Sequence, residues 1–232
     1  MHRPRYAIYY APAQRSKLWE LASQWLGRDA YTGENLARML VPAISDVDID
    51  RLTSSPRHYG FHATLKAPFE LAPDATEASL VEFARAFAAR QRPFDVALAP
   101  ASLGWFLALR LVQSSPEMTD LHTACVREFD PFRAPLTEGD INRRKKANLT
   151  ETQEARLLEW GYPYIFDEFR FHMTLTGGIQ DEALRERILG VLQQIFPETR
   201  ERVDGVALYQ QPDRESAFTI VERFEFGAPT SS

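Results

Sequence analysis

The stretch Phe171-His172-Met173-Thr174-Leu175 organises this sequence, because Phe61-His62-Ala63-Thr64-Leu65 nearly repeats it. In an extended chain, successive side chains point to opposite faces. His172 and Thr174 therefore share one face of a strand, and three apolar side chains share the other. The alternation predicts a strand whose apolar back covers a core and whose front carries an imidazole and a hydroxyl group.

The earlier copy has the same alternation. It predicts that His62, Thr64 and Lys66 lie together on the front of a strand, with apolar side chains beneath them. Two such fronts that face each other would form a site.

The repeat extends beyond the two histidine strands. His172 follows His62 by the same number of residues as Val206-Ala207-Leu208 follows Val96-Ala97-Leu98. Apolar periodicity predicts one helix between the histidine strand and the Val-Ala-Leu strand of each half, at about residues 75–90 and 181–196. A repeat with two copies indicates two related lobes and not a solenoid.

Each half has the order strand, helix, insertion, histidine strand, helix, strand. This order predicts an α+β fold of two related lobes, with mainly antiparallel sheets and one His-x-Thr on each wall of a central cleft. We expect one intertwined bilobal domain over 1–232, with halves at about 1–104 and 105–226 and a tail at 227–232.

The composition is that of an ordinary soluble protein, with 44% apolar and 25% charged residues in a chain of 232. A net charge of −5 argues against broad nucleic-acid binding, although a local basic patch could hold a phosphorylated ligand. No apolar run is long enough to span a bilayer, and the first residues lack a secretory pattern. We expect a cytoplasmic monomer without a membrane partner. On a helix at about 116–129, we expect the single cysteine, Cys125, to lie in the core and His122 to be exposed or half-buried.

Several polar residues have two readings. Arg110 lies in an otherwise apolar strand at 105–112, where it is either paired with a carboxylate or placed for an anion. The run Arg143-Arg144-Lys145-Lys146 is either solvated surface or a phosphate contact. The aromatic residues near Tyr164 could wall a cleft or pack in a core.

His58 and His62 have the spacing of two metal ligands on a helix. Pro56 and Gly60 argue against a helix at this point, so we give the metal reading little weight. The weak pattern from Gly27 onward allows one short helix near residues 34–40.

The paired histidines predict acid–base chemistry at phosphorus. A neutral imidazole can take a proton from an attacking water or hydroxyl, while an imidazolium protonates the leaving oxygen. The hydroxyls of Thr64 and Thr174 can donate to the non-bridging oxygens, and Lys66 and Arg110 can add positive charge. This mechanism needs no metal and no cofactor. The sequence has neither a G-x-x-x-x-G-K-[ST] loop nor a G-x-G-x-x-G turn, so nothing in it indicates a nucleoside triphosphatase or a dehydrogenase.

The motifs His62-Ala63-Thr64-Leu65 and His172-Met173-Thr174-Leu175 resemble those of the 2H phosphoesterase superfamily. The resemblance covers almost the whole chain. It implies a bilobal fold and a metal-independent enzyme that acts on cyclic phosphodiesters, with both histidines and both threonines catalytic.

The long insertions, residues 160–170 and the lysine after the first motif resemble a bacterial branch associated with phosphonate-degradation operons. That branch implies a small phosphorylated sugar as substrate, for example a ribosyl cyclic phosphate. The expected substrate-binding residues are Tyr59, Lys66, Arg110, Arg143, Arg144, Tyr164 and Arg170.

Three other functions remain open. Processing of RNA ends or 2′-5′ ligation would need a basic groove beyond Arg143–Lys146. A non-catalytic binder of phosphorylated ligands would not need both histidines and both threonines. A metallohydrolase using His58, His62 and His172 would be inhibited by chelators. Neither the acid–base roles of the two histidines nor the leaving oxygen follows from the sequence.

Overall fold

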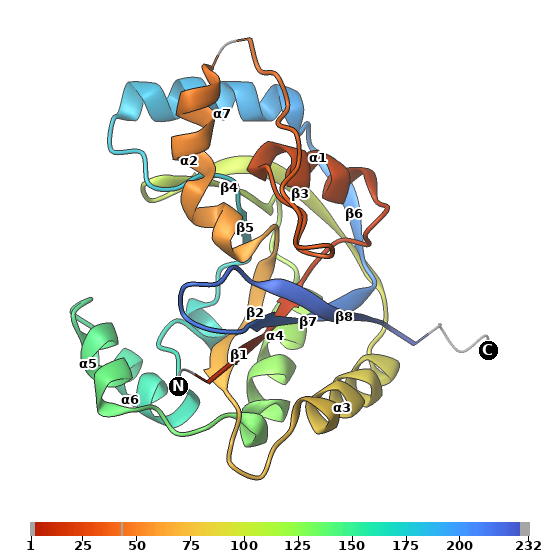
Figure 1. The fold of residues 1–232 in the computed structure, drawn as a ribbon, viewed down its shortest axis with the longest axis vertical. Helices are drawn as coiled ribbons and strands as arrows, with labels where there is room; N and C mark the ends of the chain where they lie inside the picture. Colours follow the sequence, from red (N-terminus) through yellow and green to blue (C-terminus); the bar gives the residue numbers. More distant parts are fainter. Residues whose placement is uncertain (1–2, 43, 228–232) are drawn as a thin grey trace.

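The computed structural model describes residues 3–42 and 44–227, so all but the first residue of the expected tail lie outside the described residues. The helices are α1 (Lys17–Leu26), α2 (Asp46–Tyr59), α3 (Glu77–Arg90), α4 (Pro116–Glu128), α5 (Glu138–Lys145), α6 (Glu151–Trp160) and α7 (Glu182–Ile195). The strands are β1 (Arg5–Tyr10), β2 (Ala63–Glu70), β3 (Phe94–Leu103), β4 (Phe106–Leu111), β5 (His172–Thr174), β6 (Thr199–Val203), β7 (Gly205–Gln211) and β8 (Thr219–Glu225). The predicted α+β class is confirmed (Figure 1).

The strands form one sheet in the order β6-β3-β4-β5-β2-β1-β7-β8, and every pair within it is antiparallel. The two histidine strands, β2 and β5, are neighbours at its centre. They are joined through one residue pair, Ala63 with Met173, so the ladder is shortest at this point. The site predicted from the repeat therefore lies at the junction between two four-stranded parts of the sheet.

The sheet order follows the repeat. Reading outward from the centre, β5, β4 and β3 on one side correspond to β2, β1 and β7 on the other. The strand of each half that carries the Val-Ala-Leu triplet thus pairs with the first strand of the opposite half, β3 with β4 and β7 with β1. The helices follow the same symmetry, since α3 packs on β7 and β8 while α7 packs on β3 and β4.

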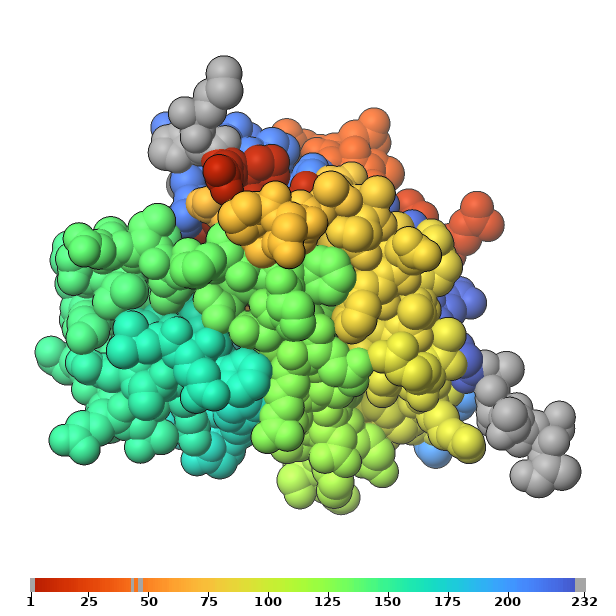
Figure 2. All heavy atoms as spheres, turned by 90° about the horizontal axis from the view of Figure 1, so that it is seen from below, coloured from red at the N-terminus to blue at the C-terminus, as the bar shows by residue number. Residues whose placement is uncertain are grey.

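The apolar faces predicted for the two histidine strands lie in the core. Phe61, Leu65, Phe171 and Leu175 are all buried, as is Cys125 in α4. Figure 1 shows α1, α2 and α7 gathered at one end of the molecule and α3 and α4 toward the other. Figure 2 shows α4 lying between the α5–α6 segment and α3 on the face seen from below.

Helix α2 corrects one expectation from the sequence. It runs to Tyr59 and contains Pro56, although Pro56 and Gly60 argue against a helix there. A proline inside a helix leaves the carbonyl four residues earlier without its partner. That carbonyl, Leu52 O, instead accepts a hydrogen bond of 2.6 Å from Gly177 N, just after the second histidine strand. Tertiary contact thus replaces the missing helical bond.

Two further segments differ from the sequence expectations. Residues 34–40 form no helix, and helix α5 occupies 138–145, where the sequence indicates a loop and a charge run. Strand β6 was also not foreseen. None of the described helices is long and apolar enough to cross a membrane.

Candidate active site

The two His-x-Thr motifs meet across the β2–β5 pair. Because Ala63 pairs with Met173 in an antiparallel ladder, Thr64 lies opposite His172 and His62 lies opposite Thr174. Residues opposite each other on neighbouring strands project from the same face of the sheet. The four predicted catalytic side chains therefore form one compact group, and all four line one cleft.

Both histidines are held by the same local device. His62 Nδ1 lies 2.9 Å from Gly60 O, and His172 Nδ1 lies 2.6 Å from Arg170 O. A carbonyl oxygen only accepts, so each Nδ1 carries a hydrogen and donates it. In the neutral ring the other nitrogen, Nε2, is then the proton acceptor. The backbone thus assigns the proton-transfer role to Nε2 in both copies.

Anchors from the core position the backbone around the two motifs. Tyr209 donates its hydroxyl hydrogen to Phe61 O at 3.0 Å, beside the first motif. Trp25 Nε1 donates to Leu175 O at 2.8 Å, at the end of the second. Both bonds are buried, so each motif is tied to the core by a neutral side-chain donor.

His62 is the more strongly perturbed histidine. Its ring stacks on Tyr9, with centroids 3.9 Å apart and an interplanar angle of 20°. The pKa of His62 is lowered to about 4, mainly by burial. The hydrogen bond to Gly60 raises this pKa, and the nearby His172 lowers it. Thr64 Oγ1 lies 3.4 Å from His62 Nε2. At neutral pH the imidazole of His62 is therefore uncharged and able to accept a proton.

His172 has a different set of neighbours. Its ring lies 5.7 Å from that of Phe106, and Arg110 is its cross-strand partner on β4. Burial lowers the pKa of His172 below its usual value, the hydrogen bond to Arg170 O raises it, and Arg110 lowers it.

The cleft in front of the motifs has a volume of about 310 Å³. Besides the two histidines and two threonines, it is lined by Arg5, Tyr9, Ser55, Tyr59, Arg144 and Tyr162, among others. A cavity of this size admits a small sugar phosphate or part of a nucleotide.

Lys66 does not share the face of His62 and Thr64, so that expectation from alternation is wrong. On β1, neighbouring residues Ile8 and Tyr9 pair with Lys66 and Thr64, respectively. One residue along β1 therefore corresponds to two residues along β2, and this irregularity is a β-bulge. The bulge turns the side chain of Lys66 to the face opposite that of Thr64. Lys66 is buried there, where its Nζ donates to Val126 O at 2.8 Å and pairs with Asp130 at 3.0 Å.

Arg110 lies beside His172 in the sheet but lines a neighbouring hollow outside the cleft. Its hydrogen bond to Ser102 O is long, at 3.4 Å, and its Nε is buried without a partner among the described residues. No carboxylate of the described residues pairs with Arg110, and its placement for an anion remains a prediction. It acts on His172 through its charge.

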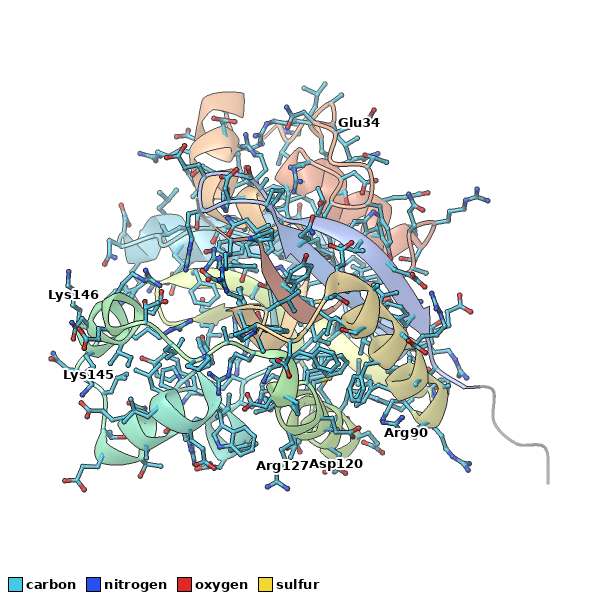
Figure 3. The ribbon with its side chains drawn as sticks, turned by 60° about the horizontal axis from the view of Figure 1, so that its bottom comes forward. Glu34, Arg90, Asp120, Arg127, Lys145 and Lys146 are labelled. Carbon is cyan, nitrogen blue, oxygen red and sulfur yellow. The ribbon has the colours of Figure 1, made fainter. Side chains whose placement is uncertain are left out.

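The four residues of the charge run, Arg143 to Lys146, lie in different environments. Arg143 is exposed and pairs with Asp140. Arg144 is half-buried, lines the cleft, and lies over the ring of Tyr162 at 5.0 Å from its centroid. Figure 3 shows Lys145 and Lys146 pointing outward from the α5 region.

Of the other expected substrate contacts, Tyr59 lines the cleft, whereas Tyr164 and Arg170 line a second cavity of about 510 Å³. That cavity shares Thr64, Tyr162 and His172 with the cleft, so the two are continuous. Phe106 and Phe169 add aromatic walls to it.

Arg5 and Tyr9 are cleft residues that sequence reasoning missed. Both lie on β1, which carries no motif of its own, and they reach the site only because β1 pairs with β2. Tyr162 was noted only among several aromatic residues upstream of the second motif. The alternation of β1 could not reveal its neighbour in the sheet.

The expected position of His122 was also wrong. It is buried, stacks on Phe169 with centroids 3.8 Å apart, and accepts a hydrogen bond of 3.2 Å from Phe166 N at its Nε2. Burial lowers the pKa of His122 to about 4. The side chain holds the segment that walls the 510 Å³ cavity.

His58 lies on α2, and its Nε2 is 3.0 Å from Gln211 Nε2. Because Gln211 Nε2 is a donor, His58 Nε2 accepts, and this nitrogen is occupied within the protein. The described residues contain no group of three or more histidine, cysteine or acidic side chains placed to hold a metal ion.

Residues 64–219 match the family described as "Protein of unknown function (DUF1045)", and the chain belongs to this family. Two curated proteins named "Ribose 1,5-bisphosphate phosphokinase PhnN" are similar in sequence. The protein from Janthinobacterium sp. (strain Marseille) is 42% identical over 75% of this chain and 39% of its own length. The protein from Laribacter hongkongensis (strain HLHK9) is 35% identical over 93% of this chain and 50% of its own length. The chain thus spans half or less of these relatives.

Solved structures with a similar chain fold include E. coli LigT complexed with 3′-AMP. The match has a TM-score of 0.48 and 15% identity, and it covers 97% of this chain and 99% of that chain. TT0787 of Thermus thermophilus gives a TM-score of 0.44 and 13% identity over 97% of this chain and 99% of that chain. The two His-x-Thr motifs, on which the resemblance stated from the sequence rests, lie on paired central strands of the sheet.

Proposed function

We propose that this protein is a metal-independent phosphodiesterase that opens the cyclic phosphodiester of a small phosphorylated ribose. The observation that carries the proposal is the pairing of two histidines in one cleft, each with Nδ1 held by a backbone carbonyl and each with a threonine opposite it. Such an arrangement suits displacement at phosphorus, in which one group takes a proton as another gives one.

In the proposed reaction His62 is the general base, since its pKa of about 4 leaves it neutral, and His172 is the general acid. His62 Nε2 takes a proton from water as the water oxygen bonds to phosphorus. The P–O bond to one ring oxygen breaks, and His172 Nε2 protonates that oxygen. Thr64 and Thr174 donate hydrogen bonds to the non-bridging oxygens as their negative charge grows.

The names of the relatives support a ribose substrate. If the cyclic phosphate joins the oxygens on carbons 1 and 2 of ribose 5-phosphate, cleavage of the P–O bond to the oxygen on carbon 2 leaves a hydroxyl there and gives ribose 1,5-bisphosphate. Ribose 1,5-bisphosphate is the compound in the name of the two phosphokinases, which contain a region similar to this chain. The opened product would then be the substrate of the kinase activity in those longer proteins.

A second candidate is a 2′,3′-cyclic nucleotide or an RNA end. The 510 Å³ cavity favours it, because Phe106, Tyr164 and Phe169 could stack on a nucleobase next to the cleft. A nucleotide substrate would therefore place its phosphate at the histidines and its base in this cavity.

The decisive experiment measures turnover of ribose 1,2-cyclic phosphate, with and without a 5-phosphate, and of 2′,3′-cyclic nucleotides, all with a chelator present. The single variants His62→Ala and His172→Ala should each lower kcat by about 10²–10⁴-fold, the usual contribution of one general acid or base. Full activity of either variant would refute the assignment.

Preference for nucleotides would move the conclusion to the second candidate. Loss of wild-type activity in the chelator would instead indicate a metallohydrolase. No turnover of any compound would count against both enzyme proposals and favour a binding protein.

A further inference from the structure

A third cavity, of about 40 Å³, borders the cleft and is strongly basic. It shares Arg5, Arg144 and Tyr162 with the cleft that holds the histidines. Its remaining charged lining is Lys66, Arg133, Arg143, Arg214, Glu70 and Asp140. Positive groups thus outnumber negative ones next to the proposed reaction centre.

Most of these cations are neutralised by carboxylates. Arg214 pairs with Glu70 at 3.1 Å and with Asp140 at 3.5 Å, and Arg143 also pairs with Asp140. Lys66 and Arg133 share Asp130, at 3.0 Å and 2.9 Å. The cations with a carboxylate partner line the small cavity but not the cleft.

Arg5 and Arg144 are different. Arg5 donates its Nε–H, at 2.8 Å, and an Nη2–H to the neutral amide oxygen of Gln211, and no carboxylate of the described residues pairs with it. Arg144 lies over the Tyr162 ring, and its Nε is buried without a hydrogen-bond partner in the described part of the chain. These two guanidinium groups are the cations that face both cavities.

Other cations lie near both groups, although the charge of Asp140 acts in the opposite direction on Arg144. Burial lowers the pKa of Arg5, and neighbouring Arg214 lowers it further. Burial also lowers the pKa of Arg144, although Tyr162 acts in the opposite direction. A buried cation without a partner is costly, and an anion that fits between the two would remove that cost.

We propose that Arg5 and Arg144 bind a second phosphate group of the substrate, carried by the end of the sugar opposite the cyclic phosphate. The inference rests on the proposed function, because it assumes that the cyclic phosphate lies at His62 and His172. Guanidinium groups are strong donors to phosphate oxygens. Gln211 holds one edge of the Arg5 guanidinium, and the ring of Tyr162 lies under that of Arg144, so both groups are fixed in position. The subsite makes the enzyme select a sugar bearing a separate phosphomonoester.

The kinetic test compares ribose 1,2-cyclic phosphate with and without the 5-phosphate. The ratio of the two kcat/KM values measures discrimination for the second phosphate. We expect the wild type to prefer the 5-phosphorylated compound, and Arg144→Met to lower the ratio by about tenfold or more, as for loss of a charged hydrogen bond. Arg5→Lys, which keeps the charge but removes the fork, should lower it as well.

Lys146→Gln is the matched control, because it removes a neighbouring charge that points away from the cleft (Figure 3). It should keep the wild-type ratio. Equal turnover of the two compounds by the wild type, or an unchanged ratio in Arg144→Met, would overturn the subsite.

A binding measurement can test the phosphate subsite independently of the proposed catalytic activity. Calorimetry with ribose 5-phosphate and with ribose, on wild type and on the double variant His62→Ala/His172→Ala, needs no turnover. Tighter binding of ribose 5-phosphate that is lost in Arg144→Met but kept in the double histidine variant supports the subsite, even if no cyclic phosphate is opened. Binding that depends on the histidines and not on Arg144, or no preference for ribose 5-phosphate, overturns it.

Discussion

Thr64 lies directly opposite His172 where β2 pairs with β5, and its hydroxyl is also 3.4 Å from Nε2 of His62 in its own motif. Thr174 and His62 form the corresponding pair. A substrate phosphate held between the two imidazoles would have a hydroxyl on either side. The single pair Ala63–Met173 fixes this relationship, because it sets the register of both strands.

Removal of either threonine hydroxyl should affect the transition state more than substrate binding. We expect Thr64→Val and Thr174→Val to lower kcat by about 10²–10³-fold with little change in KM, as for the loss of one oxyanion donor. Steady-state kinetics at saturating substrate would measure this. Thr→Ser variants, which keep the hydroxyl, serve as controls, and a change confined to KM would contradict the proposed role.

The pH profile should have its maximum on the acidic side of neutrality. The active form needs neutral His62, which exists above its pKa of about 4, and protonated His172, which exists below a pKa that is itself lowered. As the pH increases, kcat/KM should therefore rise around pH 4. It should fall again at a pH no higher than about 6.5, the ordinary pKa of histidine. The two apparent values belong to the coupled pair. A maximum above pH 7 would contradict the assignment.

His122 should make folding stability depend on pH. Its pKa is about 4 in the folded protein and about 6.5 when unfolded, so between these values the unfolded state binds the extra proton. The free energy of unfolding should be greatest above about pH 6.5 and fall by about 3 kcal/mol as the pH drops toward 4.

Denaturant unfolding at several pH values would measure the contribution of His122. His122→Gln keeps an acceptor for Phe166 N but cannot titrate, and its stability should depend less steeply on pH than that of the wild type. Identical slopes for the two proteins would exclude this role.

Lys66 should matter for stability and not for catalysis. Loss of one partner from a buried ion pair costs about 3–5 kcal/mol, and we expect the lower end for Lys66→Met because Arg133 still pairs with Asp130. Chemical denaturation would measure the loss, and kcat/KM of the folded variant should stay close to that of the wild type. A large fall in kcat/KM with an unchanged fold would mean that Lys66 reaches the substrate.

The sequence predicted the histidine strands, the α+β class and most long helices because these depend on local periodicity. Helix α4 has its apolar side chains at helical spacing, and α6 begins at a capping box formed by Thr150 and Gln153. The orientation of Lys66 could not be predicted, since the bulge depends on how β2 pairs with β1. Helix α2 was missed because its proline is tolerated through a bond from Gly177, far away in the chain.

The candidate site was predictable in part. The two His-x-Thr motifs carried their own pattern, and their meeting in one cleft is now seen in the structure. Arg5 and Tyr9 have no such pattern, because only the order of strands in the sheet brings β1 to the site. The roles of the expected substrate contacts remain predictions.

The exchange of β3 and β7 between the two parts of the sheet has a consequence for the origin of the fold. A chain that contained one half alone would lack the strand that completes its sheet. Two identical copies could supply it to each other by domain swapping, and their two-fold axis would bring two identical His-x-Thr strands together. The present chain has the arrangement of such a dimer joined end to end, which lets its two histidines acquire different surroundings and different acidities.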